Sequence, residues 1–481
     1  MTLRTLPQPA PTEPPSRADE FVRGVSEMIG GPIGEHAVKR STRRWYRPVA
    51  RIVLALVCFT LVAHWVQKSP CQDGAWSDLK QYRQMCYTDV LALYYAEGLS
   101  DGRVPYRDHA VEYPVLTGIL MGALGLPVHA LGKDDPNINQ GEWFYNLNAL
   151  VLGAIAVASV AAMLAMRQRR PWDVAMFALA PALFVTATVN WDLLAVGFAV
   201  FGLYAWVRRR PALAGVLLGL GTAAKLWPGF LFIPLLLLGL RTRRFLPTFI
   251  AACFGIGTWS LVNQPIMQAY PASWREFFRL NETRAIDWGT LWYLGDHFPF
   301  IGALPGAGWF DTHISVLNTV TRVTFVMCCL GIAFLVFAAP RPPRLAQLAF
   351  LVVAAFLIFS KVWSQQYVLW LLPLAVLARP RWGAFLAWQG AEVLYFCAFY
   401  GELLGASGKP IFPESVFDLA ALIRLTSVVV LCAYVVRDIL RPELDVVRTS
   451  YDGEDPDGGL LNDDPAAEWP PAQQSPALAL S

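Results

Sequence analysis

Residues 49–66 read VARIVLALVCFTLVAHWV, and this stretch decides the class of fold. A helix of this length rises about 27 Å, close to the roughly 30 Å of a bilayer's hydrocarbon core. The stretch contains one formally charged residue, Arg51, and a basic cluster at residues 39–47 precedes it. Because basic residues stay on the cytoplasmic side, this flank predicts a cytoplasmic N-terminus and a first helix that acts as a signal anchor.

The composition of the whole chain agrees with this local pattern. Of the 481 residues, 55% are hydrophobic and only 16% are charged, whereas a soluble domain has about 25% charged residues. The net charge of +3 gives no indication of a nucleic-acid partner, and the first 30 residues lack the apolar segment of a cleavable signal peptide. We therefore expect an all-α polytopic membrane protein surrounded by the lipid bilayer. The same composition excludes a disordered chain, a fibrous protein and an ordinary cytosolic enzyme.

Basic clusters recur between apolar runs after residue 167, which predicts helices that cross the membrane in pairs. These runs lie at 174–189, 192–206, 211–224, 226–240, 245–262, 314–338, 345–359, 366–378, 383–399 and 418–436. With 49–66 and 144–166 they make about 12 spanning helices, if the Gly- and Pro-interrupted run 115–131 is re-entrant or spans the membrane incompletely. The alternative is 13 spanning helices and one violation of the charge rule.

This topology divides the chain into three regions. Residues 1–48 are expected to be a disordered cytoplasmic tail with a basic flank, and residues 49–440 the membrane domain. Residues 441–481 are acidic and rich in Pro and Gly, which predicts a second disordered cytoplasmic tail. In this topology the large polar segments 67–113 and 263–313 are extracytoplasmic loops. The protein is therefore expected to be a multi-pass protein of the plasma membrane.

Two of the eight cysteines, Cys71 and Cys86, lie in the first extracytoplasmic loop. An oxidising compartment favours a disulfide between them, with two free thiols as the alternative. The sequence contains no C-x-x-C or H-E-x-x-H pattern, so we expect neither a metal nor another cofactor.

Polar residues collect at the outer tips of three predicted hairpins. The tips contain Asn190 and Asp192, then Lys225, then Lys361 with Gln366 and Tyr367. A lysine near the centre of a membrane helix costs about 2.5–3.5 kcal/mol on insertion scales. Lys225 snorkelling to the interface and Asp192 capping a helix are the structural alternatives. Because all three tips face the side of the two large loops, we expect a polar cavity that opens outward.

The first loop carries the most specific pattern. Asp89 precedes the apolar residues of a short helix that contains Tyr94. Tyr106 and the triplet Glu112-Tyr113-Pro114 follow. Asp89 could be the N-cap of that helix, which is a common role for aspartate, or a functional carboxylate beside the expected cavity.

Together these motifs resemble the GT-C glycosyltransferases and, more narrowly, glycosyltransferase family 87, over roughly residues 49–440. The first-loop matches are Asp89, Tyr94 (or Tyr95), Gly102, Pro105-Tyr106 and Tyr113-Pro114, with Val115 in place of a second proline. Later matches are Lys225-Leu-Trp-Pro228, Arg284-Ala-Ile-Asp287-Trp-Gly289, and Ser364-Gln-Gln366-Tyr367-Val-Leu-Trp370, with Gln365 in place of a proline.

The resemblance implies a GT-C fold and transfer of a sugar from a polyprenyl-phosphate donor to an envelope glycolipid or glycan acceptor. It implies Asp89 as the general base that takes the acceptor's proton, and a single base with direct displacement predicts inversion. The candidates for binding the donor phosphate are Lys225, Arg284 and Lys361. A divalent cation held by loop carboxylates, as in some GT-C enzymes, is the alternative to a reaction without metal.

Further residues are candidates for substrate contact, each with a structural role as its alternative. They are Tyr94, Tyr106, Glu112, Tyr113, Asn190, Asp192, Asp287, His297, Gln366 and Tyr367. Mannose is the expected sugar on the habit of the family, and a pentose such as arabinofuranose is the alternative. The competing classes are a lipid-linked sugar transporter or flippase, whose repeated halves this chain lacks, and a non-catalytic protein of envelope synthesis.

Overall fold

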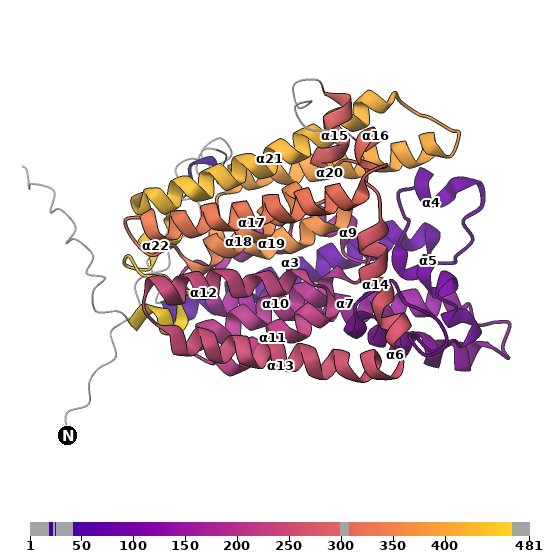
Figure 1. Ribbon diagram of the computed structural model, residues 1–481, viewed down its shortest axis with the longest axis horizontal. Helices are drawn as coiled ribbons and strands as arrows, with labels where there is room; N and C mark the ends of the chain where they lie inside the picture. The colour runs from indigo at the N-terminus through magenta and orange to yellow at the C-terminus, as the bar shows by residue number, and fades with distance from the viewer. Residues whose placement is uncertain (1–18, 23–24, 26–41, 299–306, 464–481) are drawn as a thin grey trace, which may run out of the picture.

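The computed structural model describes residues 19–22, 25, 42–298 and 307–463. Within these residues every regular element is an α-helix or a 3-10 helix. The long helices run along the longest axis of the molecule (Figure 1). Helices α4 (Lys80–Arg83), α5 (Asp89–Ala96) and α14 (Pro271–Thr283) lie at one end, and α22 (Val446–Ser450) lies at the other. We call these the loop end and the tail end.

Six helices are long and apolar enough to cross a membrane. They are α3 (Thr42–Lys68), α6 (Val115–Gly132), α7 (Gln140–Met166), α13 (Phe245–Ala269), α17 (Ile314–Ala338) and α21 (Glu414–Leu440). These helices support the expectation of a helical membrane protein, while the total of about 12 crossings stays a prediction.

Shorter apolar helices fill the space between the long ones. They are α8 (Ala175–Ala178) with α9 (Pro181–Thr186), α10 (Asp192–Val207), α11 (Pro211–Ala224), α12 (Phe232–Arg241), α18 (Leu345–Phe359) and α19 (Val368–Ala378). The 25-residue helix α20 (Trp382–Ala406) pairs with α21. Proline stands in the first turn of α9 and of α11, where its missing N–H costs no helical hydrogen bond.

Three expected boundaries differ from the structure. Helix α3 begins at Thr42, so the ordered chain starts before residue 49. Helix α6 is continuous through Pro127 and is among the six long apolar helices, so residues 115–131 are not interrupted. Helix α13 extends to Ala269, because Pro265 is accommodated within its last turns, and the second loop therefore starts later than residue 263.

Close packing of α11 on α13 depends on glycine. A Cβ atom at Gly215 would overlap the backbone carbonyl of Ala251, and one at Gly219 would overlap that of Gly255. Small residues spaced four apart allow two membrane helices to approach at backbone distance, where dispersion contacts hold them together. This packing fixes the C-terminal end of α11, where Lys225 is the C-cap.

We expect Gly215→Ala to lower the free energy of unfolding by about 1–3 kcal/mol, because the added methyl group must displace a backbone carbonyl. The matched control is Gly257→Ala on α13, where a Cβ would meet nothing within 4 Å. That control should be neutral or slightly stabilising, since alanine favours helix more than glycine. Thermal unfolding of the detergent-solubilised protein measures both, and equal midpoints for the two variants would contradict the proposed contact.

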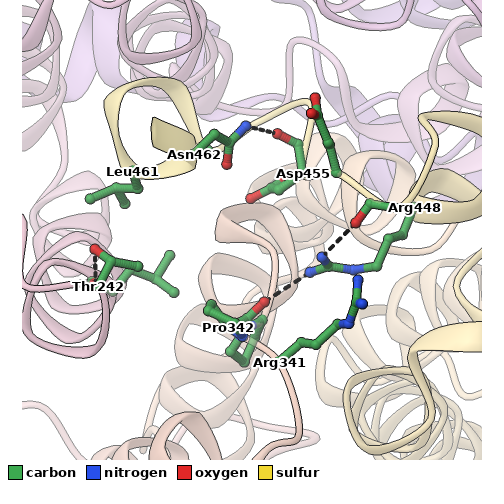
Figure 2. Close-up of a pocket in the computed structure, with 12 residues that line it drawn as sticks. Thr242, Arg341, Pro342, Arg448, Asp455, Leu461 and Asn462 are labelled. Carbon is green, nitrogen blue, oxygen red and sulfur yellow. Dashed lines mark hydrogen bonds between the residues drawn. The ribbon is translucent and has the colours of Figure 1, made fainter. Parts of the chain in front are cut away.

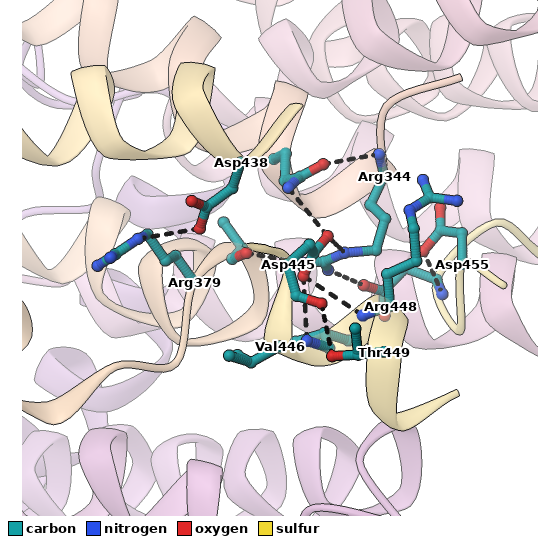
Figure 3. A network of polar contacts seen from close by, with 12 residues as sticks. Arg344, Arg379, Asp438, Asp445, Val446, Arg448, Thr449 and Asp455 are labelled. Atoms are coloured by element: carbon teal, nitrogen blue, oxygen red, sulfur yellow. Dashed lines mark hydrogen bonds and ion pairs between the residues drawn. The ribbon is translucent and has the colours of Figure 1, made fainter. Parts of the chain in front are cut away.

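At the tail end the structure differs from the predicted disorder of residues 441–481 over its described part, which extends to residue 463. The chain continues after α21 as η7 (Pro442–Leu444), α22 and η8 (Gly459–Asp463). Asp445 forms a two-pronged ion pair with Arg344, at 2.7 and 3.1 Å (Figure 3). Asp457 pairs in the same way with Arg167. The acidic segment therefore folds onto the basic clusters between the helices, and residues 464–481 lie outside the described part of the chain.

The N-terminal tail also makes a described contact. Asp19 accepts a hydrogen bond from the backbone N–H of Trp382 at 2.5 Å, at the start of α20. The other residues before Thr42, apart from 20–22 and 25, lie outside the described part, so the prediction of disorder is not tested there.

The loop end consists of short elements tied to the helices. Its remaining elements are η1 (Ser69–Cys71), η2 (Ser77–Leu79), η3 (Leu99–Asp101), α15 (Leu291–His297) and α16 (Ala307–Phe310). A disulfide joins Cys71 to Cys86. Lys68, fully buried at the end of α3, donates from Nζ to the carbonyls of Met85 and Tyr87. These links hold the chain that leads into α5 in place.

Candidate active site

Asp89 is the first residue of α5, but it does not cap the helix. The N-cap is Thr88, whose hydroxyl oxygen accepts from the N–H of Val90 at 3.2 Å. The backbone N–H of Asp89 donates to the carbonyl of Val189 at 2.7 Å, which fixes the loop against the tip before α10. The alternative that Asp89 is the N-cap of this helix is therefore wrong, and its side chain is available for another role.

Asn190 connects Asp89 to the rest of the site. Its amide nitrogen donates to Asp89 Oδ2 at 2.7 Å and to the Tyr113 hydroxyl at 2.6 Å. Its amide oxygen accepts from the backbone N–H of Trp191 at 2.6 Å and from Lys225 Nζ at 3.5 Å. One buried amide thus places the aspartate of the first loop and the lysine of the α11 tip side by side.

Lys225 forms an ion pair with Asp192, with 2.7 Å between Nζ and Oδ1. The Asp192 side chain is fully buried, and its Oδ1 also accepts from Trp370 Nε1 at 2.5 Å. The N-cap of α10 is Trp191, so Asp192 does not act as the helix cap. Both structural alternatives are therefore wrong, because Lys225 points to a buried carboxylate rather than snorkelling.

Aromatic rings enclose the ammonium group of Lys225. The ring centres of Tyr113, Tyr367 and Trp370 lie 5.8, 5.3 and 5.8 Å from Nζ. Tyr367 stacks on Trp370 with 4.0 Å between centroids. Such faces stabilise a partly desolvated cation by roughly 0.5–2 kcal/mol each. They leave little of the side chain open to solvent, since Lys225 is 13% exposed.

The surroundings set the protonation of the loop carboxylates. Burial raises the pKa of Asp89, and hydrogen bonds from Asn190 and Tyr87 together with the charge of Lys225 oppose that rise. Burial also raises the pKa of Glu112, as does the charge of Asp89. The two carboxylates thus interact across the site, and such opposed effects are common where groups exchange protons.

The second loop lies beside the third tip. The backbone N–H of Asp287 donates to the carbonyl of Lys361 at 2.9 Å, and Lys361 Nζ donates to the carbonyl of Arg284 at 2.6 Å. Ser364 Oγ lies 3.5 Å from Asp287 Oδ2, while the exposed guanidinium of Arg284 is 3.9 Å from it. Burial raises the pKa of Asp287, opposed first by Arg284.

A cavity of about 370 Å³ lies between the second and third tips and α14. Three cationic side chains and five phenyl rings line it, beside Tyr367, Trp370, other polar groups and the carboxylate of Glu282, which lies 3.8 Å from Arg322. The cations are Lys225, Arg322 and Lys361, and the phenyl rings are Phe277, Phe278, Phe325, Phe356 and Phe359. This combination suits a molecule with an anionic group and an apolar chain.

Four of the sequence candidates lie elsewhere or are covered. Tyr94 is fully buried, donating to Gln140, and Tyr106 is 2% exposed, donating to the carbonyl of Tyr113. Both pack the loop rather than face a substrate. Gln366 is buried, and His297 contacts Tyr293 and Glu414 instead of the cluster around Asn190.

The model of Glycosyltransferase family 87 matches residues 115–364, just over half of the chain. The chain belongs to glycosyltransferase family 87. The match spans Asn190, Lys225, Arg284 and Lys361, whereas Asp89 lies before it. A search of the curated proteins returned no match to this glycosyltransferase.

Sequence reasoning missed two contributors to the site of this family 87 glycosyltransferase. Arg322 lines the cavity from α17, and an arginine within the apolar run 314–338 was a signal for it. Tyr87 hydrogen-bonds to Asp89, yet it stands in a polar loop where nothing in the sequence distinguishes it.

A second cavity, of about 180 Å³, lies at the tail end of the glycosyltransferase. Figure 2 shows Arg341, Arg448 and Asp455 around it, with Arg448 donating to the carbonyl of Pro342 at 2.8 Å. None of the candidate catalytic or substrate-binding residues named in the sequence analysis lines this cavity. The cavity beside Lys225 is therefore the candidate active site.

The buried pair predicts a non-additive effect on stability. Lys225→Met should lower the free energy of unfolding by about 3–5 kcal/mol, because it leaves the Asp192 carboxylate buried and unpaired. Combining Lys225→Met with Asp192→Leu should recover a large part of that loss, because no charge then remains. Denaturant or thermal unfolding of both single variants and the double variant gives the free energies for a double-mutant cycle. Additive losses of unfolding free energy would show that Lys225 and Asp192 are not coupled.

Proposed function

We propose that this glycosyltransferase moves a sugar, with mannose as the first candidate, from a polyprenyl-phosphate donor to an envelope glycolipid or glycan. Membership of family 87 supports the reaction class. The observation that carries the finer proposal is the cavity beside Lys225, which combines three cations with a phenyl-lined wall. In this proposal the loop end faces the extracytoplasmic side of the plasma membrane in a GT-C fold of about 12 crossings.

Asp89 is the proposed general base. Attack by an acceptor hydroxyl on the anomeric carbon requires that the hydroxyl lose its proton, and a positioned carboxylate contributes typically 10²–10⁴-fold. The hydrogen bond from Asn190 orients the carboxylate. Direct displacement with one base inverts the anomeric centre, by analogy with inverting glycosidases. Glu112 and Asp287 are proposed to position acceptor hydroxyls, because both carboxylates interact with the charges around Asp89 or Arg284.

Lys225, Arg284 and Lys361 are the proposed partners of the donor phosphate, and Arg322 joins them. Negative charge develops on the phosphate as the sugar leaves, and cations already in place stabilise it without reorganisation. The phenyl rings of α14, α17 and α18 offer the polyprenyl chain an apolar wall. We assign no metal to the transfer step, since Asp192 is neutralised by Lys225 and Asp287 lies beside Arg284.

A transporter or flippase of lipid-linked sugars and a non-catalytic membrane protein are the competing functions. A transporter alternates access about a site near the middle of the membrane. The polar groups of the proposed site lie instead at the loop end, where Asp89, Asn190 and Lys225 meet. The variants below also distinguish these classes, because neither alternative requires a proton acceptor at Asp89.

Asp89→Asn should reduce sugar transfer by at least about 10²-fold, roughly 2.7 kcal/mol of transition-state stabilisation. The protein should accumulate normally, because the cap of α5 is Thr88 and the amide oxygen still accepts from Asn190. Transfer from a radiolabelled polyprenyl-phosphate sugar measures the effect. The matched control is Asp101→Asn, an exposed aspartate of the same loop, and near-normal transfer by Asp89→Asn would reject the assignment.

The pH profile gives an independent test of the base. A base acts only when deprotonated, so transfer should fall as the pH drops through the pKa of Asp89. Because burial raises that pKa, the fall should lie above the ordinary range of aspartate, which centres near 3.9. An activity that stays constant down to about pH 4, with the protein still folded, would contradict a base of raised pKa.

Arg284→Gln should raise KM for the polyprenyl-phosphate sugar about tenfold, equivalent to roughly 1.4 kcal/mol of donor binding. Its guanidinium is exposed and pairs with Asp287 at 3.9 Å, which is its only ion pair among the described residues, so the substitution should leave the fold intact. The control is Arg279→Gln on α14, whose side chain pairs with Glu276. Steady-state kinetics at varied donor concentration compare the two, and an unchanged KM for Arg284→Gln would remove it from the donor site.

A further inference from the structure

A second cluster of polar side chains lies outside the proposed site, where α15 meets the first turns of α21. One ligand-capable atom each from His297, Glu414 and Asp418 lies within 4.8 Å of the other two. Glu414 and Asp418 are four residues apart and share one face of α21. His297 reaches them from the last turn of α15, with its Nε2 at 3.4 Å from Glu414 Oε1.

Asp418 provides a separate indication that something is bound here. Its side chain is 6% exposed, and its Oδ1 has no hydrogen-bond partner among the described residues. Neither Glu414 nor Asp418 forms an ion pair with lysine or arginine in the described part of the chain. A buried carboxylate oxygen without a hydrogen-bond donor is costly. A protonated His297 places a positive charge beside the two carboxylates, and a bound metal ion would supply that charge in its place while also contacting Asp418 Oδ1.

The histidine is held as metal-binding histidines are. His297 Nδ1 lies 3.0 Å from the backbone carbonyl of Tyr293, to which it donates, and Nε2 therefore faces the carboxylates, where it could bind a metal ion once deprotonated. The Tyr293 ring stacks on the imidazole at 4.4 Å, and its hydroxyl donates to Glu414 Oε1 at 2.9 Å. Both ligands are thus oriented by the same tyrosine, and Glu402 of α20 adds negative charge nearby.

We propose that His297, Glu414 and Asp418 bind one Zn²⁺ ion, which fastens the second loop to α21. One imidazole and two carboxylates with an open fourth position are a ligand set that zinc accepts. Ligand atoms around tetrahedral zinc lie roughly 3.4 Å apart, so the cluster must contract by little more than an ångström. His297 and Glu414 are partly exposed, 27% and 57%, and can make that movement.

The ion would act as a positioning element and would take no part in the transfer chemistry. The segment from Arg284 to Gly289 runs directly into α15, and the Trp288 ring lies 6.5 Å from that of Phe417 on α21. Fixing α15 against α21 therefore limits the movement of Arg284 and Asp287 at the proposed donor site. The zinc site itself does not depend on which sugar or acceptor the enzyme uses.

The direct test uses the full-length protein purified in detergent. We expect one Zn²⁺ per chain after loading and desalting, by elemental analysis. Co²⁺ in place of zinc should give the intense visible absorption of a four-coordinate site, which a mere hydrogen-bond cluster cannot produce. Chelation should lower the midpoint of thermal unfolding, and added Zn²⁺ should restore it. Wild-type protein that retains no zinc and gives no cobalt spectrum would overturn the proposal.

Variants assign the ligands. His297→Gln and Asp418→Asn should each weaken Zn²⁺ binding at least tenfold and abolish the cobalt spectrum. His313→Gln is the matched control, because His313 follows in the same loop but stacks on Trp309 and lies outside the cluster. Zinc binding that is equal in His297→Gln, Asp418→Asn and wild type would place the ion elsewhere and reject these ligands. The loss of transfer in Asp89→Asn is independent of all of these outcomes.

Discussion

The need to neutralise a buried charge is the constraint on which the loop end depends. Asp192 is fully buried, and its only cationic partner in the described part of the chain is Lys225. Because an unpaired charge there would cost several kcal/mol, the tip of α11 must stay beside the start of α10. Asn190 then shares its amide between Lys225 and Asp89. A stability requirement thus assembles the groups that the proposed chemistry uses.

The two ends of the molecule use charge differently. At the tail end, Arg344 and Arg167 meet Asp445 and Asp457 in geometrically complete pairs whose members are almost fully buried. Such pairs fix a conformation but offer no group to a ligand. At the loop end, Lys225, Arg284 and Lys361 keep part of their surface toward a cavity or solvent. Partial exposure is what allows these cations to contact an additional anion.

Close helix packing connects these electrostatic features to the fold. Gly215 and Gly219 let α11 approach α13 at backbone distance, and α10 packs on the other side of α11. Lys225 ends α11, so its position follows from that packing. The second loop is placed by hydrogen bonds between Asp287, Lys361 and Arg284. Helix packing thus determines the position of Lys225, while hydrogen bonds to backbone groups determine the position of Arg284.

The sequence by itself determined the helical membrane class and the positions of the apolar helices after residue 140, but not the helices α14, α15, α16 and α22. Hydropathy and charge are local signals with strong physical consequences in a bilayer, so they can be read without a structure. Only the tertiary structure decided that Thr88 rather than Asp89 caps α5, and that Tyr94 and Tyr106 are buried. It alone revealed the docking of residues 442–463 onto distant arginines, because pairs such as Asp457 with Arg167 join residues 290 positions apart. An acidic tail has the composition of a disordered segment until its partners are known, and sequence spacing carries no information about such partners.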